Sequence, residues 1–122
     1  MIRLPGPGRI ENRAVDGSAN PYLAIAALLA AGLDGIENKM DPGAANTSNL
    51  YEVEEGDLAK RGIRVLPMSL REALGELEKD EILTGALGKD FTSYYIQVKK
   101  EEWRQYQRNV SNWETERYLM AF

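Results

Sequence analysis

The residues with the clearest chemical potential are Arg9, Glu11 and Arg13, which alternate with Ile10 and Asn12 in the segment RIENR. In an extended chain, alternate side chains share a face, so this segment would place two guanidinium groups and one carboxylate together. Guanidinium groups bind carboxylates and phosphates, and carboxylate oxygens bind hard divalent cations. The spacing therefore fits two alternatives, the wet face of an edge strand or the wall of an anion- and metal-binding cavity.

The sequence after this segment favours the cavity wall. Asn20 and Pro21 are typical of a helix start, because asparagine caps the first turn and proline at the first helical position loses no hydrogen bond. The predicted helix runs to about Lys39, where Asp41-Pro42-Gly43 supplies the stop, and residues 22–33 read YLAIAALLAAGL. This run is apolar nearly all round, so we expect a buried helix and sheltered surroundings for the strand that precedes it.

Composition narrows the available chemistry. A chain of 122 residues has the length of one domain or of a piece of something larger. It contains no histidine and no cysteine, so acid, base and metal-ligand roles fall to Asp, Glu, Tyr or Lys. The net charge of -4 argues against nucleic-acid binding, which depends on an excess of Lys and Arg.

We predict a cytoplasmic protein with no membrane partner. The lack of cysteine fits a reducing cytosol. No charged segment followed by an apolar run opens the sequence, so no signal peptide is predicted. The apolar run over residues 22–33 is shorter than the roughly 20 residues that cross a bilayer.

Further helices are predicted where a capping residue precedes apolar residues at helical spacing. The capping residues are Ser69, Asp80, Asp90 and Ser111. A glutamate follows three residues after the first and the last of them, as in a capping box. Residues 44–67 are polar and predicted to be irregular. The turn-forming LPGPG lies ahead of the strand at residues 9–13, for which no partner strand is evident.

The predicted fold class is therefore α+β and mostly α. Residues 1–19 form a strand and loop segment that carries the site residues, and residues 20–122 form a helical region of four or five helices. The short N-terminal strand or strands are expected to belong to a larger sheet, because an isolated strand pair is marginally stable.

The order of these features resembles the C-terminal segment of the catalytic domain of glutamine synthetases, the ATP-dependent ligases that join glutamate and ammonia. The resemblance rests on Arg3-Leu-Pro5, RIENR, DGSANPY at residues 16–22 and the apolar helix to Ile36. It continues through NKMDPG, NLYEV and SLREALGELEKDEIL and, more loosely, to the end of the chain. It covers nearly all of this sequence, but only the last part of a family chain.

The resemblance implies a role for each charged residue. Glu11 matches a glutamate that coordinates one of two active-site divalent cations, Mg²⁺ or Mn²⁺. Arg13 matches the arginine that binds the substrate carboxylate near the transferred phosphoryl group, Arg9 one on the nucleotide side, and Arg3 one that helps to hold phosphate. In this family ATP phosphorylates glutamate and ammonia displaces the phosphate, so metal and guanidinium groups must hold the transferring oxygens.

Some positions depart from the family pattern. Only LPGPG separates Arg3 from Arg9, whereas many members have a longer loop with a lysine near the nucleotide. Asn12 replaces a residue that is apolar in many members. Such features occur in a divergent branch that includes glutamate–methylamine ligases, so the amine is ammonia or another amine. Tyr51 resembles a tyrosine that some bacterial members adenylylate, although no proline follows, and an exposed tyrosine in an acidic loop is the alternative.

The chain lacks the other metal-binding glutamates and the metal-binding histidine of the family. One carboxylate at Glu11 cannot hold two cations that each require about six oxygens. We therefore expect a C-terminal ligase fragment that is inactive alone, exposes an apolar patch and associates into a homo-oligomer. Its partners in the full enzyme would be glutamate, ATP and ammonia or another amine.

A second hypothesis is a truncated, non-catalytic paralogue that docks onto synthetase subunits or another protein. The family's tail packs between subunit rings, and an aromatic and apolar tail suits such a contact. The tail residues concerned are Trp113, Tyr118, Leu119 and Phe122. A structural helical adaptor unrelated to the ligases is a third alternative.

Overall fold

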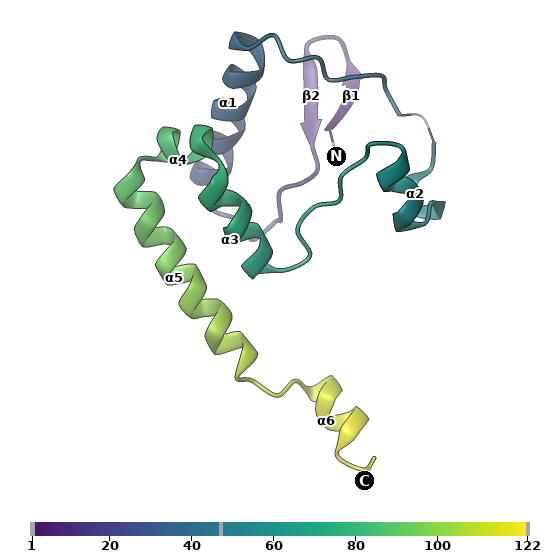
Figure 1. The fold of residues 1–122 in the computed structure, drawn as a ribbon, viewed down its shortest axis with the longest axis vertical. Helices are drawn as coiled ribbons and strands as arrows, with labels where there is room; N and C mark the ends of the chain where they lie inside the picture. The colour runs from purple at the N-terminus through teal and green to yellow at the C-terminus, as the bar shows by residue number, and fades with distance from the viewer. Residues whose placement is uncertain (1, 47, 122) are drawn as a thin grey trace.

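The protein is described by a computed structural model that covers residues 2–46 and 48–121, without the side chains of Tyr51 and Glu55. It is mostly helical, with a two-stranded antiparallel sheet at the N-terminus, which confirms the predicted class (Figure 1). The elements in chain order are β1 Ile2–Gly6, β2 Arg9–Asn12, α1 Pro21–Glu37, the 3-10 helix η1 Leu50–Glu52, α2 Glu55–Lys60, α3 Leu70–Lys79, α4 Glu81–Leu87, α5 Lys89–Gln107 and α6 Asn112–Tyr118.

The two strands form a hairpin in which β1 runs antiparallel to β2. Pro7 and Gly8 make the turn, and the φ of 68° at Gly8 suits the third position of a type II turn, where glycine is favoured. The expectation that strand 9–13 lacks a partner within this chain is therefore wrong. Pro5 obscured the partner strand, because proline donates no ladder hydrogen bond and usually argues against a strand.

Helix α1 begins as the sequence predicts and ends slightly earlier. The Asn20 side chain accepts hydrogen bonds from the backbone N–H groups of Tyr22 (3.0 Å) and Leu23 (3.3 Å). At the other end, the side chain of Asn38 donates to Asp34 Oδ1 at 2.8 Å, and Lys39 adopts a φ of 50°. The stop therefore lies at residues 38–39, before the predicted Asp41-Pro42-Gly43.

Capping side chains also begin three of the later helices. Ser69 and Asp80 cap α3 and α4, and Ser111 with Glu114 forms a complete capping box on α6. The expected Asp90 cap of α5 is wrong, because that helix starts at Lys89, directly after Gly88. Gly88 has a φ of 88°, which lets it end α4 and begin α5 without a connecting loop.

The region predicted to be irregular, residues 44–67, contains two short helices, η1 and α2. Each spans two turns or fewer, which is too short for an apolar periodicity to mark it in the sequence. The expectation for this region is therefore only partly correct.

Packing is confined to the helices of the middle of the chain. Helices α3, α4 and α5 contact one another, and α1 contacts α4. Among the described residues, the hairpin, α2 and α6 pack against no other element, and Figure 1 shows α6 at the far end of α5, away from the rest. Leu74 and Ile96 are the only buried hydrophobic side chains in the described part of the chain.

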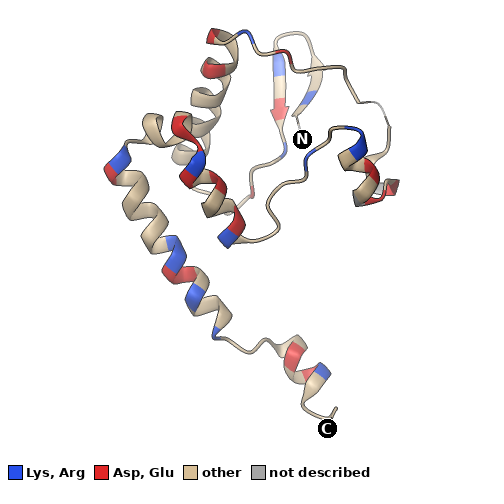
Figure 2. Cartoon of the chain, in the orientation of Figure 1, with Lys and Arg blue, Asp and Glu red and all other residues tan. Residues whose placement is uncertain are grey.

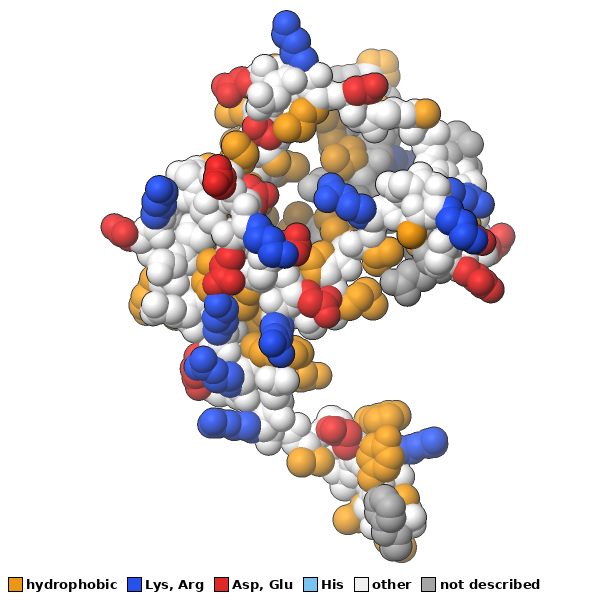
Figure 3. Space-filling view, in the orientation of Figure 1, with side chains coloured by type: hydrophobic (Ala, Val, Ile, Leu, Met, Phe, Trp, Pro, Cys, Tyr) orange, Lys and Arg blue, Asp and Glu red, His pale blue; other side chains and the backbone are white. Residues whose placement is uncertain are grey.

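The exposed surface is far larger than a compact protein would have. The accessible area is 11013 Å², whereas a compact monomer of this size exposes about 6,600 Å². The expectation that α1 is buried is wrong for this chain, because none of its residues is buried. Figure 3 shows hydrophobic side chains around the central hollow and on the tail, so the expected apolar surface is present.

The described residues include no helix that combines the length and the apolar character needed to cross a bilayer.

Candidate functional site

Glu11 is the centre of a charged cluster on one face of the hairpin. Arg3 lies directly opposite Glu11 in the strand register, and its Nη1 atom is 3.6 Å from Glu11 Oε2. Arg13 is the first residue after β2, and its Nε atom lies 3.3 Å from Glu11 Oε1. The Glu11 side chain is 36% exposed, compared with 63% for Arg3 and 66% for Arg13. Each carboxylate oxygen thus faces one guanidinium group.

Arg9 extends the same face toward the turn. It begins β2, pairs with Gly6 and is two residues from Glu11, so strand alternation places both side chains on one side. Arg9 makes no ion pair or hydrogen bond with the described residues. Its guanidinium is therefore available to an anion, and Figure 2 shows acidic and basic positions next to each other in the hairpin.

The other face of the hairpin carries two isoleucines beside Asn12. Ile2 and Ile10 belong to this face, and both are exposed. An isolated two-stranded hairpin is marginally stable in water, and its apolar face normally packs on a core. The hairpin therefore carries charge on one side and uncovered apolar side chains on the other, and its membership of a larger sheet stays a prediction.

A series of asparagine and aspartate side chains joins the hairpin to α1. Asn12 Oδ1 accepts a hydrogen bond from the N–H of Ala14 at 2.9 Å. Asp16 Oδ1 accepts from the N–H of Ser18 at 2.7 Å and from its hydroxyl at 2.5 Å. These bonds, the hydroxyl first, lower the pKa of Asp16. Together with the Asn20 cap, they define the path from strand to helix.

Neither these turns nor the pairing of Arg3 with Glu11 was predicted from the sequence. The turns have a recognisable signal, because Asx residues bond the backbone N–H two positions on, and residues 12, 16 and 20 repeat at a spacing of four. The pairing of Arg3 with Glu11 has no such signal in the sequence, because it depends on the register of the hairpin.

Comparison with known proteins identifies the family. The model of the family described as glutamine synthetase, catalytic domain, matches residues 1–118.

The chain belongs to the glutamine synthetase catalytic-domain family.

Several relatives support this assignment. A glutamate–methylamine ligase of Methyloversatilis universalis is 50% identical over 122 residues, which are 100% of this chain and 27% of that protein. A glutamine synthetase of Pyrococcus abyssi is 46% identical over 135 aligned positions, 98% of this chain and 30% of that protein. A solved structure described as apo GmaS without ligand has a TM-score of 0.79 and 38% identity, covering 98% of this chain and 27% of its own.

The chain thus spans less than a third of the length of these synthetase-family relatives. The predicted resemblance to the C-terminal segment of the catalytic domain is confirmed. The individual roles expected for Arg3, Arg9, Glu11 and Arg13 stay predictions.

The described residues do not form a complete site for the metal that the synthetase family implies. No group of three or more Asp and Glu side chains in the described part of the chain, which leaves out the Glu55 side chain, could hold a cation. Glu11 is a single carboxylate whose two oxygens face guanidinium groups. Glu11 can supply one ligand, and the remaining oxygens of a six-coordinate cation must come from elsewhere.

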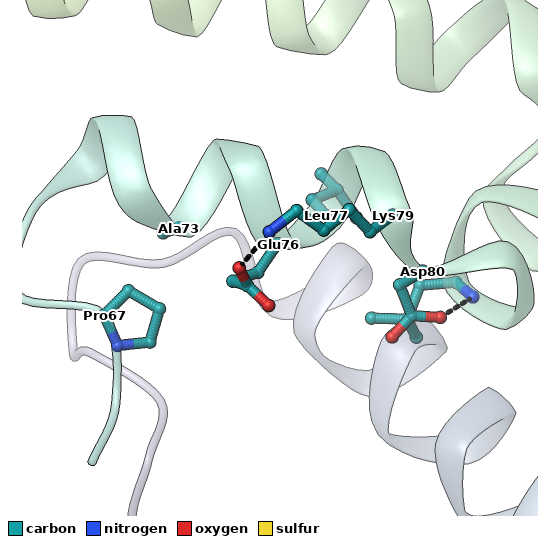
Figure 4. A pocket seen from close by; sticks show the side chains of 7 residues that line it. Pro67, Ala73, Glu76, Leu77, Lys79 and Asp80 are labelled. Carbon is teal, nitrogen blue, oxygen red and sulfur yellow. Dashed lines mark hydrogen bonds and ion pairs between the residues drawn. The ribbon is translucent and has the colours of Figure 1, made fainter. Parts of the chain in front are cut away.

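A pocket of about 420 Å³ lies away from the hairpin, on α3 and α4 (Figure 4). Its lining residues are Pro67, Ala73, Glu76, Leu77, Lys79, Asp80 and Leu83. The charged groups are already engaged, because Lys79 Nζ lies 2.7 Å from Glu76 Oε1 and Asp80 caps α4. None of the predicted site residues lines this pocket, so it is not the site expected from the synthetase resemblance.

Tyr51 lies within η1, and its side chain is outside the described part of the structure. Adenylylation of Tyr51 and the alternative of an unmodified loop tyrosine both stay predictions.

Proposed function

We propose that the chain is the C-terminal part of an ATP-dependent ligase that joins glutamate to an amine. The observation that carries the proposal is the Arg3–Glu11–Arg13 cluster on one face of the hairpin, in a chain of the glutamine synthetase family. Guanidinium groups on both sides of a carboxylate suit a reaction in which a phosphoryl group and a substrate carboxylate must be held close to a cation.

Each residue has a separate part in this proposal. Arg13 binds the glutamate carboxylate near the transferring phosphoryl group, Arg3 helps to hold that phosphoryl group, and Arg9 contacts the nucleotide. Glu11 supplies one ligand to Mg²⁺ or Mn²⁺. The bound cation would withdraw charge from the phosphoryl oxygens. The arginines add fixed positive charge to that of the cation, close to the phosphoryl oxygens on which negative charge develops.

The proposal includes inactivity of the isolated chain. Glu11 cannot complete a cation site alone, and the uncovered apolar area indicates that other polypeptide normally packs on this one. In the complete protein we expect that polypeptide to be the remainder of the catalytic domain and neighbouring subunits of a homo-oligomer.

A complementation experiment tests the proposal. The glutamate–methylamine ligase of Methyloversatilis universalis, truncated to remove the region that matches this chain, is co-purified with the chain and assayed for glutamate-dependent ATP turnover. We expect activity only when both parts are present, and loss of at least 100-fold with Glu11→Ala. Glu54→Ala, an exposed carboxylate before α2 that makes no capping hydrogen bond, is the control and should leave turnover unchanged. Activity that survives Glu11→Ala would contradict the metal-ligand role.

The amine is ammonia in the leading proposal, and methylamine is a second candidate. The methylamine candidate is favoured by the 50% identity to a glutamate–methylamine ligase, compared with 46% for the synthetase of Pyrococcus abyssi. The comparison is made with the complete protein that carries this chain, by measuring kcat/KM for both amines. A kcat/KM that is at least tenfold higher for one amine assigns that amine as the substrate.

The alternative of a non-catalytic docking module has its own supporting observation. Tail residues Trp113, Leu119 and Met120 are exposed, although Phe122 lies outside the described residues. In the complementation experiment, stable binding to the truncated ligase without any turnover would support this alternative over the catalytic one.

A further inference from the structure

Asn12 occupies an unusual position in the hairpin, between the two charged residues Glu11 and Arg13. It is the last residue of β2, pairs with Ile2 and is partly buried. Strand alternation places its side chain on the face opposite Glu11. Its Oδ1 atom accepts a hydrogen bond from the N–H of Ala14 at 2.9 Å.

This hydrogen bond closes a turn around Arg13. An asparagine that accepts a hydrogen bond from the N–H two residues on restrains the backbone of the residue between them. In this chain, Arg13 Nε is 3.3 Å from Glu11 Oε1, at the point where the strand ends. The backbone from which Arg13 projects is thus held by Asn12.

We infer that Asn12 is a positioning residue that sets the Arg13 guanidinium against the Glu11 carboxylate. The inference rests on the proposed function, in which Arg13 binds the substrate carboxylate and Glu11 binds the cation. An apolar side chain at this position has no acceptor and cannot close the turn. Asn12 therefore acts on glutamate binding through Arg13, without touching the substrate.

The test uses Asn12→Leu, which keeps the approximate size and removes the acceptor, in the complete protein that carries this chain. Loss of one hydrogen bond is worth a factor of about two to ten, so KM for glutamate should rise by that factor. KM for ATP should be unchanged, because the substitution displaces Arg13, which binds glutamate, and leaves Arg9, which contacts the nucleotide, in place. Asn12→Asp retains an acceptor oxygen and should restore most of the glutamate affinity.

A matched control exists in the same chain. Asn46 Oδ1 also accepts a hydrogen bond from the N–H two residues on, at Ser48, at 2.9 Å. This hydrogen bond lies outside the hairpin, so Asn46→Leu removes an equivalent side-chain acceptor and should leave both KM values unchanged. Equal increases in both KM values for Asn12→Leu would indicate general damage and overturn the inference.

Amide hydrogen exchange at Ala14 gives a readout that does not depend on activity. Exchange should be faster in Asn12→Leu than in wild type and should return toward the wild-type rate in Asn12→Asp. Equal exchange rates at the Ala14 amide in wild type, Asn12→Leu and Asn12→Asp overturn the inference, even if Asn12→Leu is poorly folded. The positioning role and the proposed function can fail separately. If the wild-type protein ligates glutamate and Glu11→Ala does not, the proposed function stands. If Asn12→Leu then behaves as wild type, the positioning role alone is overturned. A wild-type protein without ligase activity overturns both.

Discussion

Arg3 and Glu11 face each other directly across the β1–β2 hairpin, with Arg3 Nη1 3.6 Å from Glu11 Oε2. The nine residues from Arg3 to Glu11 therefore suffice to bring an anion-binding group and a candidate metal ligand together. Both side chains are open to solvent, so the pair contributes little to stability and is better placed to meet a ligand.

Arg3→Gln should separate the contribution of Arg3 to stability from its contribution to ligand binding. Because exposed ion pairs are worth about 0.2–1 kcal/mol, we expect the free energy of unfolding to change by less than about 1 kcal/mol. In the complete protein, kcat/KM should fall about 100-fold, as for loss of a group that stabilises developing charge. Thermal unfolding and steady-state kinetics measure the two effects. Arg71→Gln, an exposed position on α3, is the control, and equal losses in both variants would exclude a special role for Arg3.

The isolated chain should associate through its uncovered apolar surface. Helix α1 alone exposes several large side chains, among them Ile25, Leu29 and Leu33. We expect light scattering to show oligomers or aggregates, and a hydrophobic dye to bind. Leu29→Glu should weaken association by placing a charge on this surface, whereas Ala59→Glu on α2 should not. A monodisperse monomer that binds no dye would contradict this prediction.

Leu74→Ala tests the small core between α3 and α5. Leu74 is 3% exposed, and loss of a buried leucine side chain costs about 2–5 kcal/mol. With so few buried residues, that loss should remove most of the helical circular-dichroism signal of the chain at 37 °C. Leu66→Ala, at a half-exposed position, should change stability by less than about 0.5 kcal/mol. Similar denaturation curves for the two variants would show that α3 and α5 do not share a core.

The turn at Asp16 should weaken in acid. Its hydrogen bonds to Ser18 lower the pKa of Asp16 in the folded chain. A carboxyl group with a lowered folded pKa stabilises the fold above its unfolded pKa, and this contribution is lost as pH falls through the folded pKa. Ser18→Ala should raise the pKa of Asp16 toward its ordinary value in an NMR titration. Ser93→Ala should not, and an unchanged pKa in both variants would contradict the assigned cause.

The helices show which parts of the fold were predictable. Asn20, Ser69, Asp80 and Ser111 each cap the helix that the sequence assigns to them. Capping depends on a few neighbouring residues, so its signal is present in the sequence. Helix α5 began at Lys89 instead of after Asp90, because Gly88 could adopt a backbone conformation that no local pattern had marked.

The hairpin shows which parts were not predictable. Alternation placed Arg9 and Glu11 on one face of β2, whereas the strand ended at Asn12, and Arg13 reached Glu11 from just beyond it. The pairing of Arg3 with Glu11 required the register of β1, which Pro5 concealed. The hydrogen bond from the Ala14 N–H to Asn12 was likewise not predicted, although Asn12 lies between Glu11 and Arg13.

By itself, the sequence determined the family, the helix starts and the alternation of charge in RIENR, because each depends on residue types at short spacing. Only the tertiary structure decided that Arg3 joins Glu11 and that α1 lies uncovered. Both outcomes depend on which distant segments meet, and the free energy of such contacts comes from burial between elements and not from the residues of either element alone.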